Sequence, residues 1–194
     1  MNSVLKRAFF AAALAALAAP AYPQSASPAP TIEQRKENQQ DRIANGVASG
    51  ELTATETKNL EKKESALNHE ERDMRKLDNG KLTAADRATL NQQQNQLSRQ
   101  IYHQKHDASV QSVNPTSEVK RREENQQDRI AEGIKSGQLT AGEAAHLEKR
   151  EAAINKEIKT DRAANGGKLT PAERHQVNRQ ENRTSAAIYR KKHN

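Results

Sequence analysis

The sequence predicts an all-α protein built from two homologous three-helix modules. Three observations lead to this prediction: the chain repeats itself, a helix-stop and helix-start signal recurs four times, and large aliphatic residues recur every seven positions. Shifting the 194-residue chain by 87 residues aligns 35–107 with 122–194 without a gap, and 38 of the 73 pairs are identical. Self-similarity at a fixed offset is typical of a duplicated structural unit.

Composition supports a helical chain with little apolar material. Leu, Ile, Val and Phe number 29 of 194 residues, there is no Trp, and only two Phe and three Tyr occur. This content is below the level typical of a conventional core, and it argues against a large enzyme domain or a β-sandwich. The absence of cysteine excludes disulfides, thiolate metal sites and cysteine nucleophiles.

Residues 1–21 have the pattern of a secretory signal peptide. Lys6 and Arg7 precede a twelve-residue apolar stretch, Ala8–Ala19, and small residues follow at Ala19 and Ala21. The stretch is too short to span a bilayer as a helix. We therefore predict cleavage after Ala21 and export to a bacterial periplasm or beyond, which leaves no membrane span. The Pro-, Ala- and Ser-rich residues 22–31 are predicted to form a tether.

Four similar segments each combine a helix end with a helix start. Each reads Gly-x-Leu-Thr-x-x-acid, in which Gly suits the left-handed position after a helix and Thr is the N-cap of the next. The acid three residues after Thr completes a capping box. The predicted structural cap residues are Thr53, Glu56, Thr83, Asp86, Thr140, Glu143, Thr170 and Glu173.

Between these signals the apolar residues form narrow seams. Leu60 and Leu67, or Leu90 and Leu97, lie seven residues apart and so fall on one side of a helix. We predict helices at 32–48, 54–78 and 84–106 in module 1 (32–106), and at 119–135, 141–164 and 171–192 in module 2 (118–194). Residues 107–117 are the predicted linker. Such thin seams favour elongated hairpins with open grooves, or a homo-oligomer that shares the seams.

The repeated Leu-Thr-x-x-acid element resembles the LTxxQ signature of the Spy/CpxP family of periplasmic proteins. The matches are Leu52–Glu56, Leu82–Asp86, Leu139–Glu143 and Leu169–Glu173, with an acid in place of Gln at every position. The resemblance implies a small, exported, helical protein that acts as a stress chaperone or a metal-linked sensor. The whole repeat also resembles a group of uncharacterised secreted bacterial helical-repeat proteins, which implies no activity.

Few residues are candidates for metal binding or catalysis. His103 and His106 lie one helical turn apart and, with Asp107, are the predicted ligands of a divalent metal. Their pattern is only partly repeated in the second module, and a plain surface patch is the other interpretation. The sequence has no Gly-rich phosphate loop and no serine nucleophile elbow, and we expect no carboxylate pair to point inward. We therefore predict no catalysis and no cofactor.

The net positive charge is concentrated in the second module. The chain has pI 9.7 and net charge +7, and residues 118–194 hold 17 basic and 12 acidic groups. In the last helix the predicted seam is Val177, Thr184 and Ile188, and arginines lie on the opposite side. The predicted contacts of an anionic partner are Arg179, Arg183, Arg190, Lys191 and Lys192. A solubilising face is the other interpretation.

Three functions follow as hypotheses. The first is a non-catalytic exported envelope protein with a binding or chaperone-like role, which holds protein clients in helical grooves. The second is a divalent-metal-binding periplasmic protein. The third is a structural protein that binds anionic envelope polymer through the basic last helix. Export and scarce aromatic residues argue against a nucleic-acid partner.

Overall fold

The computed structural model describes residues 29–111 and 117–193, and all their regular structure is helical. The all-α prediction is confirmed, and every predicted helix boundary agrees to within one residue. The six helices are α1 (Ile32–Ala48), α2 (Ala54–Leu77), α3 (Ala84–Lys105), α4 (Glu118–Lys135), α5 (Ala141–Ala164) and α6 (Pro171–Lys192). The predicted signal peptide, most of the tether and linker residues 112–116 lie outside the described residues.

Helix starts follow the predicted local chemistry. All four predicted capping boxes form. At the start of α5 the Thr140 amide donates to Glu143 Oε2 at 3.1 Å, and the Glu143 amide donates to Thr140 Oγ1 at 3.3 Å. The glycine before it, Gly137, has φ 71°, a left-handed conformation that suits glycine. A fifth box, Thr31 with Gln34, caps α1 and was not predicted.

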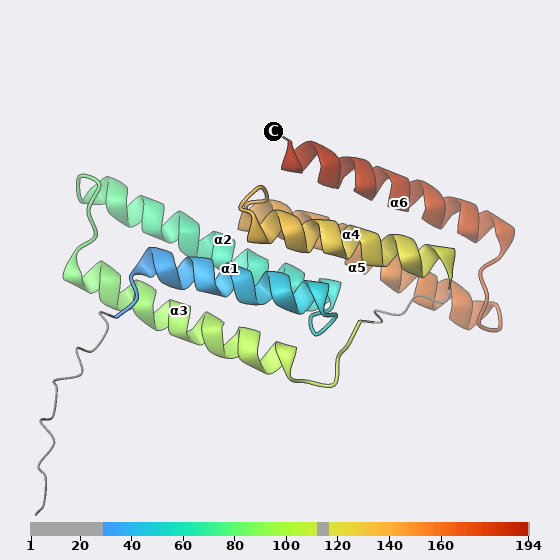
Figure 1. Ribbon diagram of the computed structural model, residues 1–194, viewed down its shortest axis with the longest axis horizontal. Coiled ribbons are helices and arrows are strands. Elements are labelled where there is room, and N and C mark those ends of the chain that lie inside the picture. The colour runs from blue at the N-terminus through green and yellow to red at the C-terminus, as the bar shows by residue number, and fades with distance from the viewer. Residues whose placement is uncertain (1–28, 112–116, 194) are drawn as a thin grey trace, which may run out of the picture.

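The six helices form an approximately two-fold arrangement of the two repeat copies (Figure 1). Helix α2 packs antiparallel along its repeat mate α5, and α1 packs along its mate α4. Helix α3 packs on α1 and α2 at one outer edge, and α6 packs on α4 and α5 at the other. Contact of each central helix with its own mate is the mark of a two-fold, self-complementary interface.

The principal core joins the two copies. Leu60 of α2 and Leu147 of α5 are both fully buried in one cluster, together with Ile43 of α1 and Ile130 of α4. A smaller cluster of Val119, Ile154, Ile158 and Val177 lies within the second copy. The division into two modules therefore stays an interpretation of the repeat, because the main core crosses it. None of the helices in the described residues has a stretch long and apolar enough to span a membrane.

Candidate functional site

Four glutamates lie buried where α2 packs on α5. Glu61 and Glu64 of α2 and their repeat mates Glu148 and Glu151 of α5 are each 0 % exposed. Glu64 is buried because it is on the same side of α2 as the seam, roughly 40° around the helix from Leu60. The expectation that no carboxylate pair points inward is therefore wrong: each central helix carries one.

Hydrogen bonding leaves most of these carboxyl oxygens without a partner. Gln40 Nε2 of α1 donates to Glu61 Oε2 at 3.3 Å, and Gln127 Nε2 of α4 donates to Glu148 Oε2 at 3.1 Å. The other oxygen of Glu61 and of Glu148, and both oxygens of Glu64 and Glu151, have no hydrogen-bond partner in the structure. The interface is symmetric in its donors as well as in its acids.

Burial raises the pKa of all four carboxyls. Desolvation raises the pKa of Glu61 and of Glu148 to about 8, and Glu148 adds repulsion to Glu61. Desolvation raises the pKa of Glu64 to about 7, against the partly offsetting charge of Lys36. The pKa of Glu151 rises to about 9, through desolvation and then through neighbouring carboxyls. At neutral pH the carboxyls of Glu61, Glu148 and Glu151 are therefore mainly protonated, and that of Glu64 is close to half protonated, because burial disfavours the charged form.

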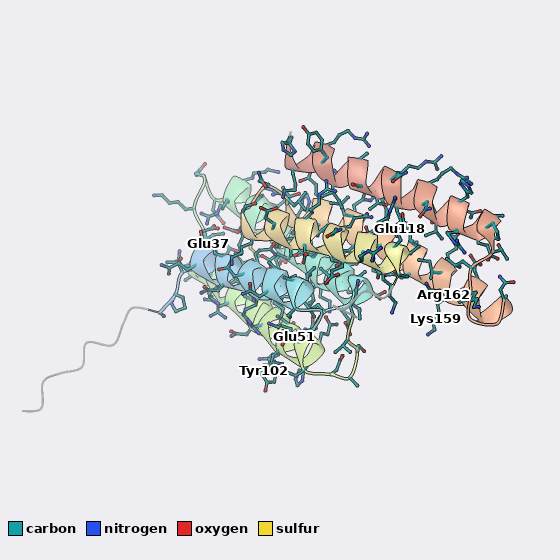
Figure 2. The ribbon with its side chains drawn as sticks, turned by 45° about the vertical axis from the view of Figure 1, so that its right-hand side comes forward. Glu37, Glu51, Tyr102, Glu118, Lys159 and Arg162 are labelled. Carbon is teal, nitrogen blue, oxygen red and sulfur yellow. The ribbon has the colours of Figure 1, made fainter. Side chains whose placement is uncertain are left out.

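Two hollows lie at matching positions in the two copies, and one of the four buried carboxyls, Glu64, lines the first of them. The first, of about 590 Å³, lies between α1, α2 and the α4–α5 turn, and Glu64, Lys36 and Arg72 line it. The second, of about 600 Å³, lies between α4, α5 and the start of α2. In it Glu123 takes the place of Lys36, and Lys159, labelled in Figure 2, takes the place of Arg72.

The predicted metal ligands do not form a ligand set. His103, His106 and Asp107 are exposed at the end of α3. The His106 ring stacks on Tyr102 with centroids 4.2 Å apart, and the His103 ring meets Tyr102 edge-on at 5.8 Å. Tyr102 extends from the outer edge of the molecule (Figure 2). Within residues 29–111 and 117–193, no three His, Asp or Glu side chains are placed to hold a metal ion.

The phase predicted for the last helix is confirmed. Val177, Thr184 and Ile188 are buried, and the opposite side of α6 carries three exposed arginines, Arg179, Arg183 and Arg190.

The two predicted lysines have internal partners. Lys191 Nζ lies 3.2 Å from Glu143 Oε1, and Lys192 Nζ lies 2.7 Å from Glu132 Oε2. One arginine not predicted, Arg150 of α5, lines a hollow of about 250 Å³ together with Arg183. The accessible cationic face is therefore Arg179, Arg183 and Arg190 with Arg150 beside it, and we call it the arginine face.

The seams themselves do not line open grooves. Leu60 and Leu147 are buried in the core that joins the two copies, and Ile154 and Ile158 are buried within the second copy. The buried glutamates were missed although a signal existed: Glu61 and Glu64 are both identical to their repeat mates, and Glu64 sits on the apolar side of its helix. The chain matches no family model, no curated protein and no solved structure. The resemblances stated from the motifs therefore stay predictions.

Proposed function

We propose that this chain is a non-catalytic, exported binding protein of the bacterial envelope, and that its arginine face docks an anionic polymer. The observation that carries the proposal is the exposure of Arg179, Arg183 and Arg190 along the outer side of α6. The two glutamates of α6 do not compete with them, because Glu173 caps the helix and Glu181 is buried.

The spacing of the arginines suits a polymer with repeated anionic groups. At 1.5 Å per residue, Arg183 lies about 6 Å along the axis from Arg179 and about 10 Å from Arg190. A guanidinium can bind a phosphate or carboxylate through two parallel hydrogen bonds, which an ammonium cannot. Arg150 widens the face toward α5, where it shares a hollow with Arg183.

Only one edge of the molecule carries this face. The repeat mates of the three arginines on α3 are Gln92, Gln96 and His103. Because α3 and α6 occupy opposite outer edges (Figure 1), the proposed polymer binds on one side and leaves the α3 edge open. Duplication alone would leave the two copies alike at these positions. The arginines found only in the second copy therefore support a binding role for α6.

A triple substitution tests the proposal. In Arg179→Gln/Arg183→Gln/Arg190→Gln we expect unchanged helical circular dichroism and an unchanged melting midpoint, because all three side chains are exposed. Binding to soluble polyphosphate, measured by calorimetry at low salt, should weaken about tenfold or more and lose most of its salt dependence.

The repeat provides a matched control. Gln92→Arg/Gln96→Arg/His103→Arg places the same three arginines on α3 and should increase affinity for polyphosphate. Polyphosphate binding that is equal in the parent and in the Gln triple variant would leave only a solubilising role for the arginine face.

A further inference from the structure

The α2–α5 interface places four carboxyls where a protein contact ordinarily has apolar or paired groups. Six of their eight oxygens have no hydrogen-bond partner in the structure, and all four side chains are 0 % exposed. A charged carboxylate held in this way costs several kcal/mol unless a cation or enough donors compensate for the lost water. Charging these carboxyls therefore weakens the packing of α2 on α5.

The surroundings add more acid than base. Toward α2, helix α1 presents Gln40 and Lys36, and α5 presents Glu148. Helix α3 faces α2 with Gln93 and Gln100, which bind Glu70 and Lys63. The groups that face the α5 carboxyls are Gln127 and Glu123 of α4, Glu181 of α6 with Arg122 acting on it, and Glu61 of α2.

Within the part of the chain that the structure describes, Lys36 is the one cation acting directly on these four carboxyls, and it is already paired. Its Nζ lies 3.1 Å from Glu71 Oε2 and 3.2 Å from Glu33 Oε2. Its repeat mate is Glu123, so in the second copy an acid replaces even this partial compensation. Neutral carboxyls thus fit the packed interface, and charged ones do not.

We propose that the α2–α5 interface is a proton-controlled contact: four protonated glutamates hold the two copies together, and loss of these protons separates α2 from α5. The closed form, with α2 packed on α5, binds these protons more tightly than the open form, in which the two helices are apart. Water solvates each carboxylate in the open form and so stabilises its charge. Acid therefore closes the interface and alkali opens it, which exposes Leu60 and Leu147 of the shared core. This control is independent of anion binding at α6.

The chain suits a direct test because it has no cysteine. Lys62 and Lys149 are exposed repeat mates, one on α2 and one on α5, so Lys62→Cys/Lys149→Cys in the mature protein carries two nitroxide labels. Pulsed electron paramagnetic resonance then reports the label distance at about pH 5 and about pH 10, below and above the raised pKa values of the four carboxyls. We expect one short distance at the lower pH and a shift of at least half of the molecules to longer distances at the higher pH.

Glutamine variants identify the groups responsible, because Gln has the shape of a neutral Glu and cannot lose a proton. Glu61→Gln/Glu64→Gln/Glu148→Gln/Glu151→Gln should keep the short distance at both pH values. The matched control Glu70→Gln/Glu157→Gln alters half-buried repeat mates on the same helices and should open like the parent.

Two results would overturn the proposal: a parent distance that is the same at both pH values, or a quadruple variant that opens as the parent does. Should the quadruple variant not fold, the pairs Glu61→Gln/Glu148→Gln and Glu64→Gln/Glu151→Gln take its place. Each pair should reduce the shifted fraction, and no reduction in either would equally overturn the proposal.

Discussion

At the scale of single residues, Glu61 is the clearest case of a side chain whose chemistry is set by its surroundings. It has one hydrogen bond from Gln40, one oxygen without a partner and a fully buried side chain. Desolvation raises its pKa from 4.5 to about 8. The folded chain therefore binds a proton here that the unfolded chain releases above about pH 4.5.

This difference predicts the sign of the pH dependence of stability. A raised pKa stabilises fully below the unfolded value of 4.5, and the contribution is lost as the pH rises through about 8. Glu71 and Glu143 have lowered pKa values, the first through Arg75 and the second through its own capping box, each against a desolvation effect that raises them. Their contribution to the free energy of unfolding is lost instead as the pH falls through these lowered pKa values. Stability should therefore be greatest in mild acid.

Substitution of one buried acid tests the sign. Glu61→Gln should raise the free energy of unfolding by about 3–5 kcal/mol near pH 8 and by about 1 kcal/mol or less near pH 5, because Gln needs no proton to be neutral. Urea denaturation followed by circular dichroism at the two pH values measures this. Glu70→Gln serves as the control, and an equal effect of Glu61→Gln at both pH values would contradict the assignment.

At the scale of helices, the close contact between α4 and the turn that follows it depends on Gly133. A Cβ placed there would lie 2.6 Å from Leu139 Cδ1, and one on its repeat mate Gly46 would lie 2.8 Å from Leu52 Cδ1. Both leucines are buried and cannot move aside freely. Glycine in these helices is thus required by packing, although it weakens the helix by itself.

The two opposing effects give a testable balance. Alanine gains about 1 kcal/mol of helix propensity over glycine, whereas overpacking a filled core costs about 1–3 kcal/mol. We expect Gly133→Ala to lower the free energy of unfolding by about 1 kcal/mol, measured by urea denaturation. At Gly142 the added Cβ would meet only Ser65 Oγ, at 3.3 Å, so Gly142→Ala should not destabilise. Stabilisation by both substitutions would show that the α4 contact is loose.

At the scale of the whole molecule, the two-fold arrangement makes each copy the partner of the other. Leu60 faces a core shared with Leu147, and Glu61 lies near Glu148. A single copy would leave this surface in water, and its own apolar content is small. The interface is self-complementary because mates contact mates.

We therefore predict that residues 22–107 alone form a homodimer in mild acid. A second copy would supply the contacts that α4 and α5 supply in the full chain, with α2 packed antiparallel on α2. Light scattering coupled to size exclusion should give twice the mass of the fragment, and Leu60→Asp should abolish the dimer. A folded monomeric fragment would mean that the shared core is dispensable.

The sequence by itself determined the helices of this protein. Their ends depend on local chemistry, on Thr and an acid three residues later, and their seam phase depends on spacing along one helix, as at Val177 and Ile188. These interactions span a few residues. The exposure of Arg179, Arg183 and Arg190 followed from the same phase.

Only the tertiary structure decided what covers the seams. From the sequence, the seam around Leu60 could line an open groove, pack in an oligomer or pack on the other copy. Apolar periodicity shows which side of a helix is buried but not what packs against it. The burial of Glu61 and Glu64 followed from that choice, because a carboxyl beside a seam stays solvated until another helix packs over it. The pairing of Lys191 and Lys192 with Glu143 and Glu132 likewise depended on residues brought together across long stretches of chain.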